Sequence, residues 1–137
     1  MPKVLIADKM DKLAEEIFRR NGLDVDIKTG LSPHELAEII APYDAVACRS
    51  SAKITKEVLA KAPNLKVIGR AGIGVDTIDV PAATAAGVIV MNTPFGNSIT
   101  TAEHAIAMMM SLAREIPAAN ASTQAGKWEK NKFEGVE

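Results

Sequence analysis

The sequence predicts an α/β fold: a five-stranded parallel sheet with helices on both faces. Five short apolar runs, rich in β-branched residues, alternate with stretches whose apolar residues recur at helical spacing. Capping and turn residues separate the two kinds of segment. Such regular alternation indicates right-handed crossovers between parallel strands. The 137 residues, of which 47% are hydrophobic, are enough to bury a real core.

The first half of the chain contains three of the expected strands, at residues 4–7, 23–27 and 44–48. In the second of these, apolar and charged residues alternate, which indicates a strand with one solvated face near a sheet edge. A helix expected within residues 9–21 ends at Gly22. The next helix begins at Ser32, an N-cap serine, and Glu35 completes a capping box.

The next stretch supplies two more helices and two more strands. Thr55 opens one helix, and an alanine-rich helix begins at Asp79 and stops at Gly87. The strands are expected at residues 67–70 and 88–91. Together these elements predict a flavodoxin-like strand order, 2-1-3-4-5.

The character of the chain changes after Asn97. Ser98 or Thr100 is expected to cap a helix, the latter with Glu103 in a capping box. Residues 102–113 are apolar almost all round, and such a helix must be buried on every face. The rest of the chain offers little to cover it. We therefore expect it to pack against more protein than these residues provide.

Pro117 is expected to break this helix. Residues 118–125 can form another, ended by Gly126, before a polar segment that carries Trp128 and Phe133. Exposed aromatic side chains on a charged arm suggest a docking surface.

The bulk properties exclude several classes of function. A net charge of −1 argues against a general nucleic-acid or membrane role, and no stretch is long enough to span a bilayer. Cys48 is the only cysteine and lies in an apolar run, so it is expected to be a buried filler in a reducing compartment. The two histidines and one cysteine offer no credible zinc site.

A candidate anion site lies where parallel strands end, because ligands of open parallel sheets bind beyond the carboxyl ends of the strands. Arg49 follows the third strand and Arg70 ends the fourth, so both guanidinium groups could reach one carboxylate or phosphate. The alternative is that these arginines pair with nearby acids such as Asp8 or Asp76. We favour the anion site because the donors at these ends outnumber the acids. The glycines spaced G-x-x-G-x-G at residues 69–74 do not form a dinucleotide-binding loop.

Three segments in order, residues 49–55, 69–76 and 91–98, resemble the D-2-hydroxyacid dehydrogenase family. The resemblance implies that residues 1–97 are the N-terminal part of a substrate-binding domain. Residues 98–137 would then be an interdomain helix and the start of an NAD-binding Rossmann domain whose remainder is absent. The family's G-x-G-x-x-G loop and its catalytic arginine, glutamate and histidine have no counterpart here. The resemblance therefore assigns no catalytic residue and no metal to this chain, which alone is expected to be inactive.

The resemblance also implies the roles of individual residues. The substrate-binding residues would be Arg49, Ser50, Arg70, Gly72, Ile73, Gly74 and Asn97. The cofactor would be NAD, and the residues near it would be Ile73, Val75 and Thr101. The main-chain N–H groups of the glycine turn, residues 72–74, would contact the substrate carboxylate.

The activity implied is the NAD-dependent oxidation of 3-phosphoglycerate to 3-phosphohydroxypyruvate in serine biosynthesis. Alternatives are a dehydrogenase acting on glyoxylate or hydroxypyruvate, and a non-catalytic NAD-sensing binding module. A signalling receiver domain is disfavoured because Arg49 stands where its phosphoacceptor aspartate is needed. Family members are oligomers, so a cytoplasmic homodimer or homotetramer is expected, with a contact around Trp128 and Phe133.

Overall fold

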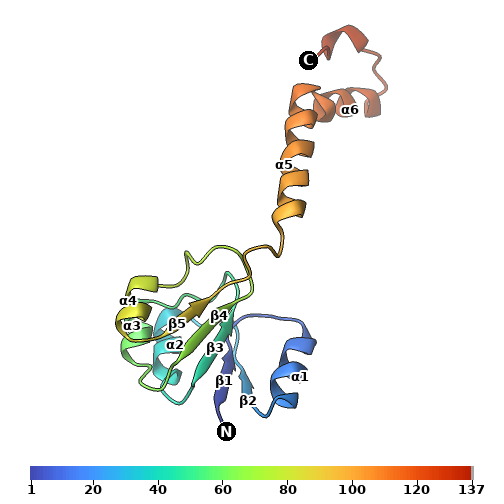
Figure 1. Cartoon of the computed structure of the whole chain (residues 1–137). Helices are drawn as coiled ribbons and strands as arrows, with labels where there is room; N and C mark the ends of the chain where they lie inside the picture. The colour runs from blue at the N-terminus through green and yellow to red at the C-terminus, as the bar shows by residue number, and fades with distance from the viewer. Residues whose placement is uncertain (137) are drawn as a thin grey trace. The chain divides into compact units, whose positions relative to one another are not determined.

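The computed structural model of the chain describes residues 1–136 and divides into two compact units. The first unit is Met1–Gly96 and the second begins at Asn97, one residue before the expected boundary (Figure 1). The first unit holds the whole sheet, and the second holds only helices.

The sheet of the first unit has five parallel strands. They are β1 (Lys3–Ile6), β2 (Asp24–Ile27), β3 (Ala45–Cys48), β4 (Val67–Arg70) and β5 (Ile89–Met91). Their order is β2-β1-β3-β4-β5, which confirms the flavodoxin-like prediction (Figure 1). The predicted edge strand is β2, where Val25 is buried and Ile27 is exposed. In the register, Cys48 lies beside Arg70, so β3 and β4 end at the same level.

Helices cover both faces of the sheet, as predicted. They are α1 (Lys12–Arg20), α2 (Pro33–Ile39), α3 (Lys56–Ala60) and α4 (Val80–Ala85). The larger core joins α2, α3 and α4 to the sheet, through residues such as Leu36, Val58 and Ile68. The smaller core lies on the α1 side and includes Ile6 and Val25. The helices of the first unit therefore hold the strands rigidly and leave the loops at the strand ends free for a site.

The capping box and the helix-ending glycines predicted in the first unit are present in the structure. Ser32 Oγ accepts the Glu35 N–H at 3.3 Å, and the Ser32 N–H donates to Glu35 Oε2 at 2.8 Å, which completes the capping box. Gly22 and Gly87 end α1 and α4 with φ angles of 76° and 72°. Side chains rarely adopt this left-handed conformation, so glycine is favoured at both positions.

The second unit consists of α5 (Ser98–Ala113), α6 (Ile116–Gln124) and a short 3₁₀ turn, η1 (Lys130–Lys132). The expected N-cap was wrong: Asn97 occupies the cap position without a side-chain bond, and Ser98 and Thr100 both lie inside α5. Pro117 does not break α5 either. The helix ends at Ala113, and Pro117 lies in the first turn of α6.

Helix α5 has no buried residue within the described chain. Ile106, Met108 and Leu112 are 57%, 58% and 80% exposed. This exposure agrees with the expectation that the chain itself offers little to cover the helix. Over residues 1–136, no helix combines the length and the hydropathy that crossing a bilayer requires.

Candidate functional site

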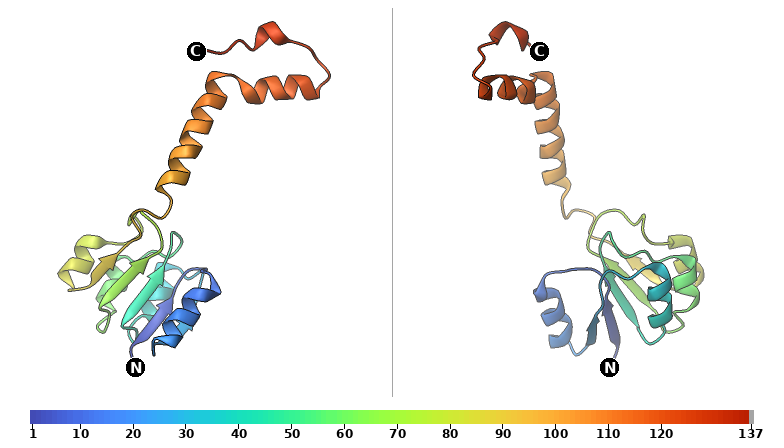
Figure 2. Two further views of the ribbon diagram at one scale, coloured as in Figure 1. Left: turned by 45° about the vertical axis from the view of Figure 1, so that its right-hand side comes forward. Right: turned by 180° about the vertical axis from the view of Figure 1, so that it is seen from behind.

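The loops that follow β1, β3 and β4 gather at one end of the sheet in the first unit (Figure 2). They carry Asp8, the loop of residues 49–52, and the glycine turn of residues 71–76. Parallel strands place their carboxyl ends at one edge, so residues far apart in sequence meet here. This is the edge at which the sequence predicts the anion site.

Asp8 fixes the loop that carries Arg49. Its carboxylate is buried, with 4% of the residue exposed, and Oδ2 accepts the N–H of Arg49 at 2.6 Å and of Ala52 at 3.0 Å. The sequence suggests Asp8 only as a counter-ion for an arginine and does not reveal this contact with the backbone. Its signal is an acid directly after a buried strand, level with the polar loop that follows the neighbouring strand.

Arg70 is buried at 8% exposure and is largely engaged within the chain. Its Nε donates to the Arg49 carbonyl at 3.0 Å, and its Nη1 donates to the Gly74 carbonyl and to Asp76 Oδ1, the latter at 2.7 Å. This pairing with Asp76 is the alternative that the sequence alone disfavours. The hydrogen bond from Arg70 holds the pKa of the Asp76 carboxyl below its usual value.

One nitrogen of Arg70 remains available to a ligand. No acceptor within residues 1–136 bonds Nη2, and this atom is not enclosed by protein. Arg70 therefore mainly links the Arg49 loop to the glycine turn, and its Nη2 is left without an acceptor in the described chain. The predicted contact of Arg70 with a ligand would therefore be made through Nη2, since Nε and Nη1 are engaged within the chain.

Arg49 has the opposite arrangement. Its backbone is held on both sides, by Asp8 at the N–H and by Arg70 at the carbonyl, while its side chain is exposed. Within the described residues its guanidinium forms no ion pair. Ser50 follows it on the same exposed loop. A free cation and a hydroxyl on a fixed backbone suit an oxyanion.

The glycine turn offers fewer N–H groups than expected. The Gly72 N–H donates to the Arg70 carbonyl at 3.0 Å. It is therefore not free to contact the substrate carboxylate, as the resemblance implies it would. The N–H groups of Ile73 and Gly74 have no acceptor within the described residues. Asn92 Nδ2 donates to the Ile73 carbonyl at 2.7 Å, which ties the turn to the end of β5.

The remaining predicted residues divide between the two units. Ile73 is 41% exposed and Val75 is half-buried, so both present apolar surface beside the free N–H groups. Asn97 and Thr101 belong to the second unit, and the structure does not place them relative to these loops. Within residues 1–136, no three His, Cys, Asp or Glu side chains form a group that could hold a metal ion.

Cys48 adjoins the site in sequence but is not a nucleophile. It is fully buried, and burial raises the pKa of its thiol to about 11. The thiolate is therefore scarce at neutral pH, as the interpretation of Cys48 as a buried filler requires.

Comparison with known proteins agrees with this arrangement. The family model described as D-isomer specific 2-hydroxyacid dehydrogenase, catalytic domain, matches residues 4–132. The chain belongs to the D-2-hydroxyacid dehydrogenase family. This confirms the resemblance carried by the arginine loop and the glycine turn.

Curated relatives place the chain more closely within this family. A D-3-phosphoglycerate dehydrogenase of Archaeoglobus fulgidus is 51% identical over 98% of this chain and 26% of its own length. The D-3-phosphoglycerate dehydrogenase of Homo sapiens is 47% identical over 98% of this chain and 25% of its own length. The chain thus spans about a quarter of the curated relatives that it matches.

Solved structures of similar proteins share the fold. The PH0520 protein of Pyrococcus horikoshii superposes with a TM-score of 0.87 and 32% identity, over 100% of this chain and 42% of its own. An NAD⁺-bound 3-phosphoglycerate dehydrogenase of Entamoeba histolytica gives a TM-score of 0.70 and 32% identity, over 83% of this chain and 39% of its own. The predicted α/β fold class is therefore confirmed for this family member.

Proposed function

We propose that this chain is the substrate-binding part of an NAD-dependent dehydrogenase that oxidises 3-phosphoglycerate to 3-phosphohydroxypyruvate in serine biosynthesis. The observation that carries the proposal is Arg49, an unpaired guanidinium on a backbone that is held in place from both sides. The curated relatives with this name support the choice of substrate.

The substrate has two anionic ends, and the site has two sets of donors. Arg49 and Ser50 would hold the phosphate, because a guanidinium forms paired, charge-assisted hydrogen bonds to its oxygens. The Ile73 and Gly74 N–H groups and Nη2 of Arg70 would bind the carboxylate. This division gives each anionic end of the substrate its own set of donors.

The exposed apolar surface of Ile73 and Val75 fits one face of a nicotinamide ring. NAD supplies the hydride acceptor of the reaction. The sequence has no G-x-G-x-x-G loop for the pyrophosphate, so the chain would hold only the nicotinamide end. We propose Asn97 as a further contact for the substrate and Thr101 as a further contact for NAD.

A test compares two substrates in the full-length protein encoded by the reading frame that contains this chain. NADH oxidation would be measured with 3-phosphohydroxypyruvate and with glyoxylate, in the wild type, Arg49→Ala and Arg20→Ala. Arg20 is an exposed arginine in the last turn of α1 and serves as the matched control. Losing one charge-assisted contact should lower kcat/KM for the phosphorylated substrate about 10- to 100-fold.

The outcomes separate the alternatives. Equal losses on both substrates in Arg49→Ala would contradict a phosphate role for Arg49. A wild type that prefers glyoxylate would indicate a neighbouring dehydrogenase, and one that binds NADH without turnover would indicate a sensing module. The 137-residue chain alone should show no turnover, because it lacks a dinucleotide loop.

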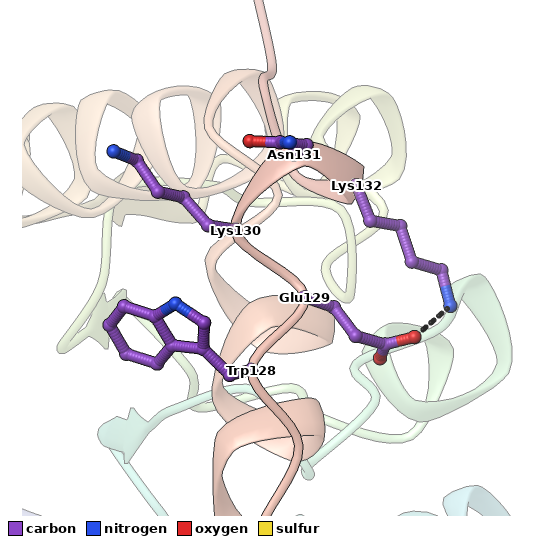
Figure 3. A pocket seen from close by; sticks show the side chains of 5 residues that line it. All are labelled: Trp128, Glu129, Lys130, Asn131 and Lys132. Atoms are coloured by element: carbon purple, nitrogen blue, oxygen red, sulfur yellow. Dashed lines mark ion pairs between the residues drawn. The ribbon is translucent and has the colours of Figure 1, made fainter.

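We also propose that the full-length protein forms a cytoplasmic homodimer or homotetramer through the segment around Trp128 and Phe133. Residues 128–132 line a depression of about 500 Å³, where Trp128 and Lys130 lie on one side of the backbone and Glu129 and Lys132 on the other (Figure 3). Trp128 is 87% exposed, and a large apolar side chain exposed in this way is typical of a contact surface. The buried free thiol of Cys48 suits a reducing compartment.

Sedimentation equilibrium of the full-length protein tests this assembly. Trp128→Ala should weaken association about tenfold or more, since truncating an aromatic residue that is an interface hot spot costs about 2 kcal/mol or more. A monomeric wild type, or an unchanged assembly in the variant, would contradict the proposed contact.

A further inference from the structure

We propose that Asp8 is a positioning residue that presents the Arg49–Ser50 loop to the phosphate of the substrate. The inference rests on the proposed function for its ligand, but the contacts of Asp8 stand on the structure alone. Oδ2 accepts the N–H groups of Arg49 and Ala52 at 2.6 and 3.0 Å. These two residues bracket the loop, so one buried oxygen fixes both of its ends.

The strand register explains why Asp8 can reach this loop. The Ala7 N–H donates to the Ala47 carbonyl at 2.9 Å, so β1 and β3 remain paired up to the residue before Asp8. Asp8 therefore lies level with the start of the loop that follows β3. Because the pairing is rigid, the carboxylate transmits the position of the sheet to the loop.

Arg70, the last residue of β4, holds the same loop from the other side. Arg70 Nε holds the Arg49 carbonyl at 3.0 Å while Asp8 holds the N–H of the same residue. The Arg49 peptide groups are thus fixed, and only its side chain is free to meet a ligand. Fixing a backbone in advance reduces the entropy lost when the side chain binds.

Burial of Asp8 is essential to this role. An exposed carboxylate beside an anion site would repel the ligand, but Asp8 is 4% exposed and lies behind the loop. The ligand therefore meets Arg49 and Ser50 rather than the aspartate.

Two substitutions separate the contact from the charge. Since one oxygen accepts both N–H groups, the single carbonyl oxygen of Asp8→Asn can keep both bonds, whereas Asp8→Ala loses both. Asp44→Ala is the matched control. Asp44 Oδ2 also accepts a backbone N–H, from Lys3 at 2.8 Å, but this contact lies at the amino ends of the strands, away from the proposed site. All three variants are made in the full-length protein.

The readouts are KM and kcat for 3-phosphohydroxypyruvate and glyoxylate, and hydrogen exchange of the peptide that covers residues 49–52. We expect Asp8→Ala to raise KM for the phosphorylated substrate about tenfold or more, with a smaller change in kcat and little change for glyoxylate. Exchange in residues 49–52 should be faster. Asp8→Asn should restore both values toward the wild type, and Asp44→Ala should leave them unchanged.

Several results would overturn the inference. They are an unchanged KM in Asp8→Ala, equal losses on both substrates, or an Asp8→Asn variant as impaired as Asp8→Ala. If the wild type does not turn over 3-phosphohydroxypyruvate, the proposed function fails, and hydrogen exchange alone then decides whether Asp8 fixes the loop. Unchanged exchange in a folded Asp8→Ala variant, with an unchanged KM, would reject the role of Asp8. If the alanine variant does not fold, an Asp8→Asn variant with a raised KM and faster exchange than the wild type would reject it.

Discussion

Gly74 is the residue at which the glycine turn tolerates no side chain without a change in the site. A Cβ atom there would lie 2.9 Å from Asp76 Oδ1 and 3.3 Å from Arg70 Nη1. We predict that Gly74→Ala displaces the flexible Asp76 carboxylate and breaks its pair with Arg70. The pKa of Asp76 should then rise toward its ordinary value, as measured by a carboxyl NMR titration.

Gly74→Ala should also change how the free energy of unfolding depends on pH in the acidic range. Because the folded pKa of Asp76 is lowered, the pair with Arg70 stabilises the fold above the ordinary aspartate pKa. This contribution disappears as pH falls through the lowered pKa. Gly72→Ala is the control, since its Cβ would meet only Arg70 Nε, at an ordinary 3.9 Å. An unshifted Asp76 pKa in Gly74→Ala would contradict the predicted clash.

Cys48 should resist thiol reagents in the native state. With the pKa of the thiol raised to about 11, its thiolate fraction at pH 8 is more than about a hundredfold below that of an ordinary cysteine, and burial blocks access as well. We predict slow reaction with a disulfide reagent in buffer and rapid reaction in denaturant. Fast reaction with the folded chain would show that β3 opens locally.

The capping box of α2 allows the contribution of one helix cap to stability to be measured. Ser32→Ala removes the side-chain bond to the Glu35 N–H and should lower the free energy of unfolding by about 1 kcal/mol, measured by urea denaturation. Thr100→Ala is the matched control, because the sequence suggests a capping box there but the residue lies inside α5. Its effect should be within about 0.5 kcal/mol.

The two capping-box patterns in the sequence, of which only the one at Ser32 forms, show what a pattern at the scale of one helix can predict. Ser32 precedes a proline that fixes the first helical turn, so only one helix start is compatible with the chain. Near Thr100, three hydroxyl residues and Asn97 compete as caps, and the backbone turns helical before Thr100 is reached. The pattern therefore predicted the existence of α5 but not its first residue.

At the scale of the whole molecule, the two units should differ in resistance to proteolysis. The first unit has a buried apolar core, whereas α5 has no buried residue and exposes Ile99, Ile106 and Leu112. Thermolysin cleaves before such residues when the backbone opens locally. We predict that the 137-residue chain is cut within α5 about tenfold or more faster than within residues 1–96. Mass spectrometry of a time course would detect the surviving fragment, and equal cleavage of both units would contradict the prediction.

The sequence by itself determined the α/β class, the strand order, the edge strand β2 and the strand ends at which the candidate site is proposed. These follow from periodicity and capping, which act over a few residues, and from general rules for parallel crossovers. It also led to the family, because three spaced motifs are far more specific than any one of them.

Only the tertiary structure decided how the charged residues divide their roles. The sequence places Asp8, Arg49 and Arg70 at one edge, but it does not say which donor meets which acceptor. Pairing between β1, β3 and β4 brings Asp8 and Arg49, 41 positions apart, to a hydrogen bond of 2.6 Å. It also engages Nε and Nη1 of Arg70 and the Gly72 N–H with acceptors of the same chain. Arg49 is left free because its own backbone is already held. Such partner choices depend on distances of tenths of an ångström, which residue spacing along a chain does not encode.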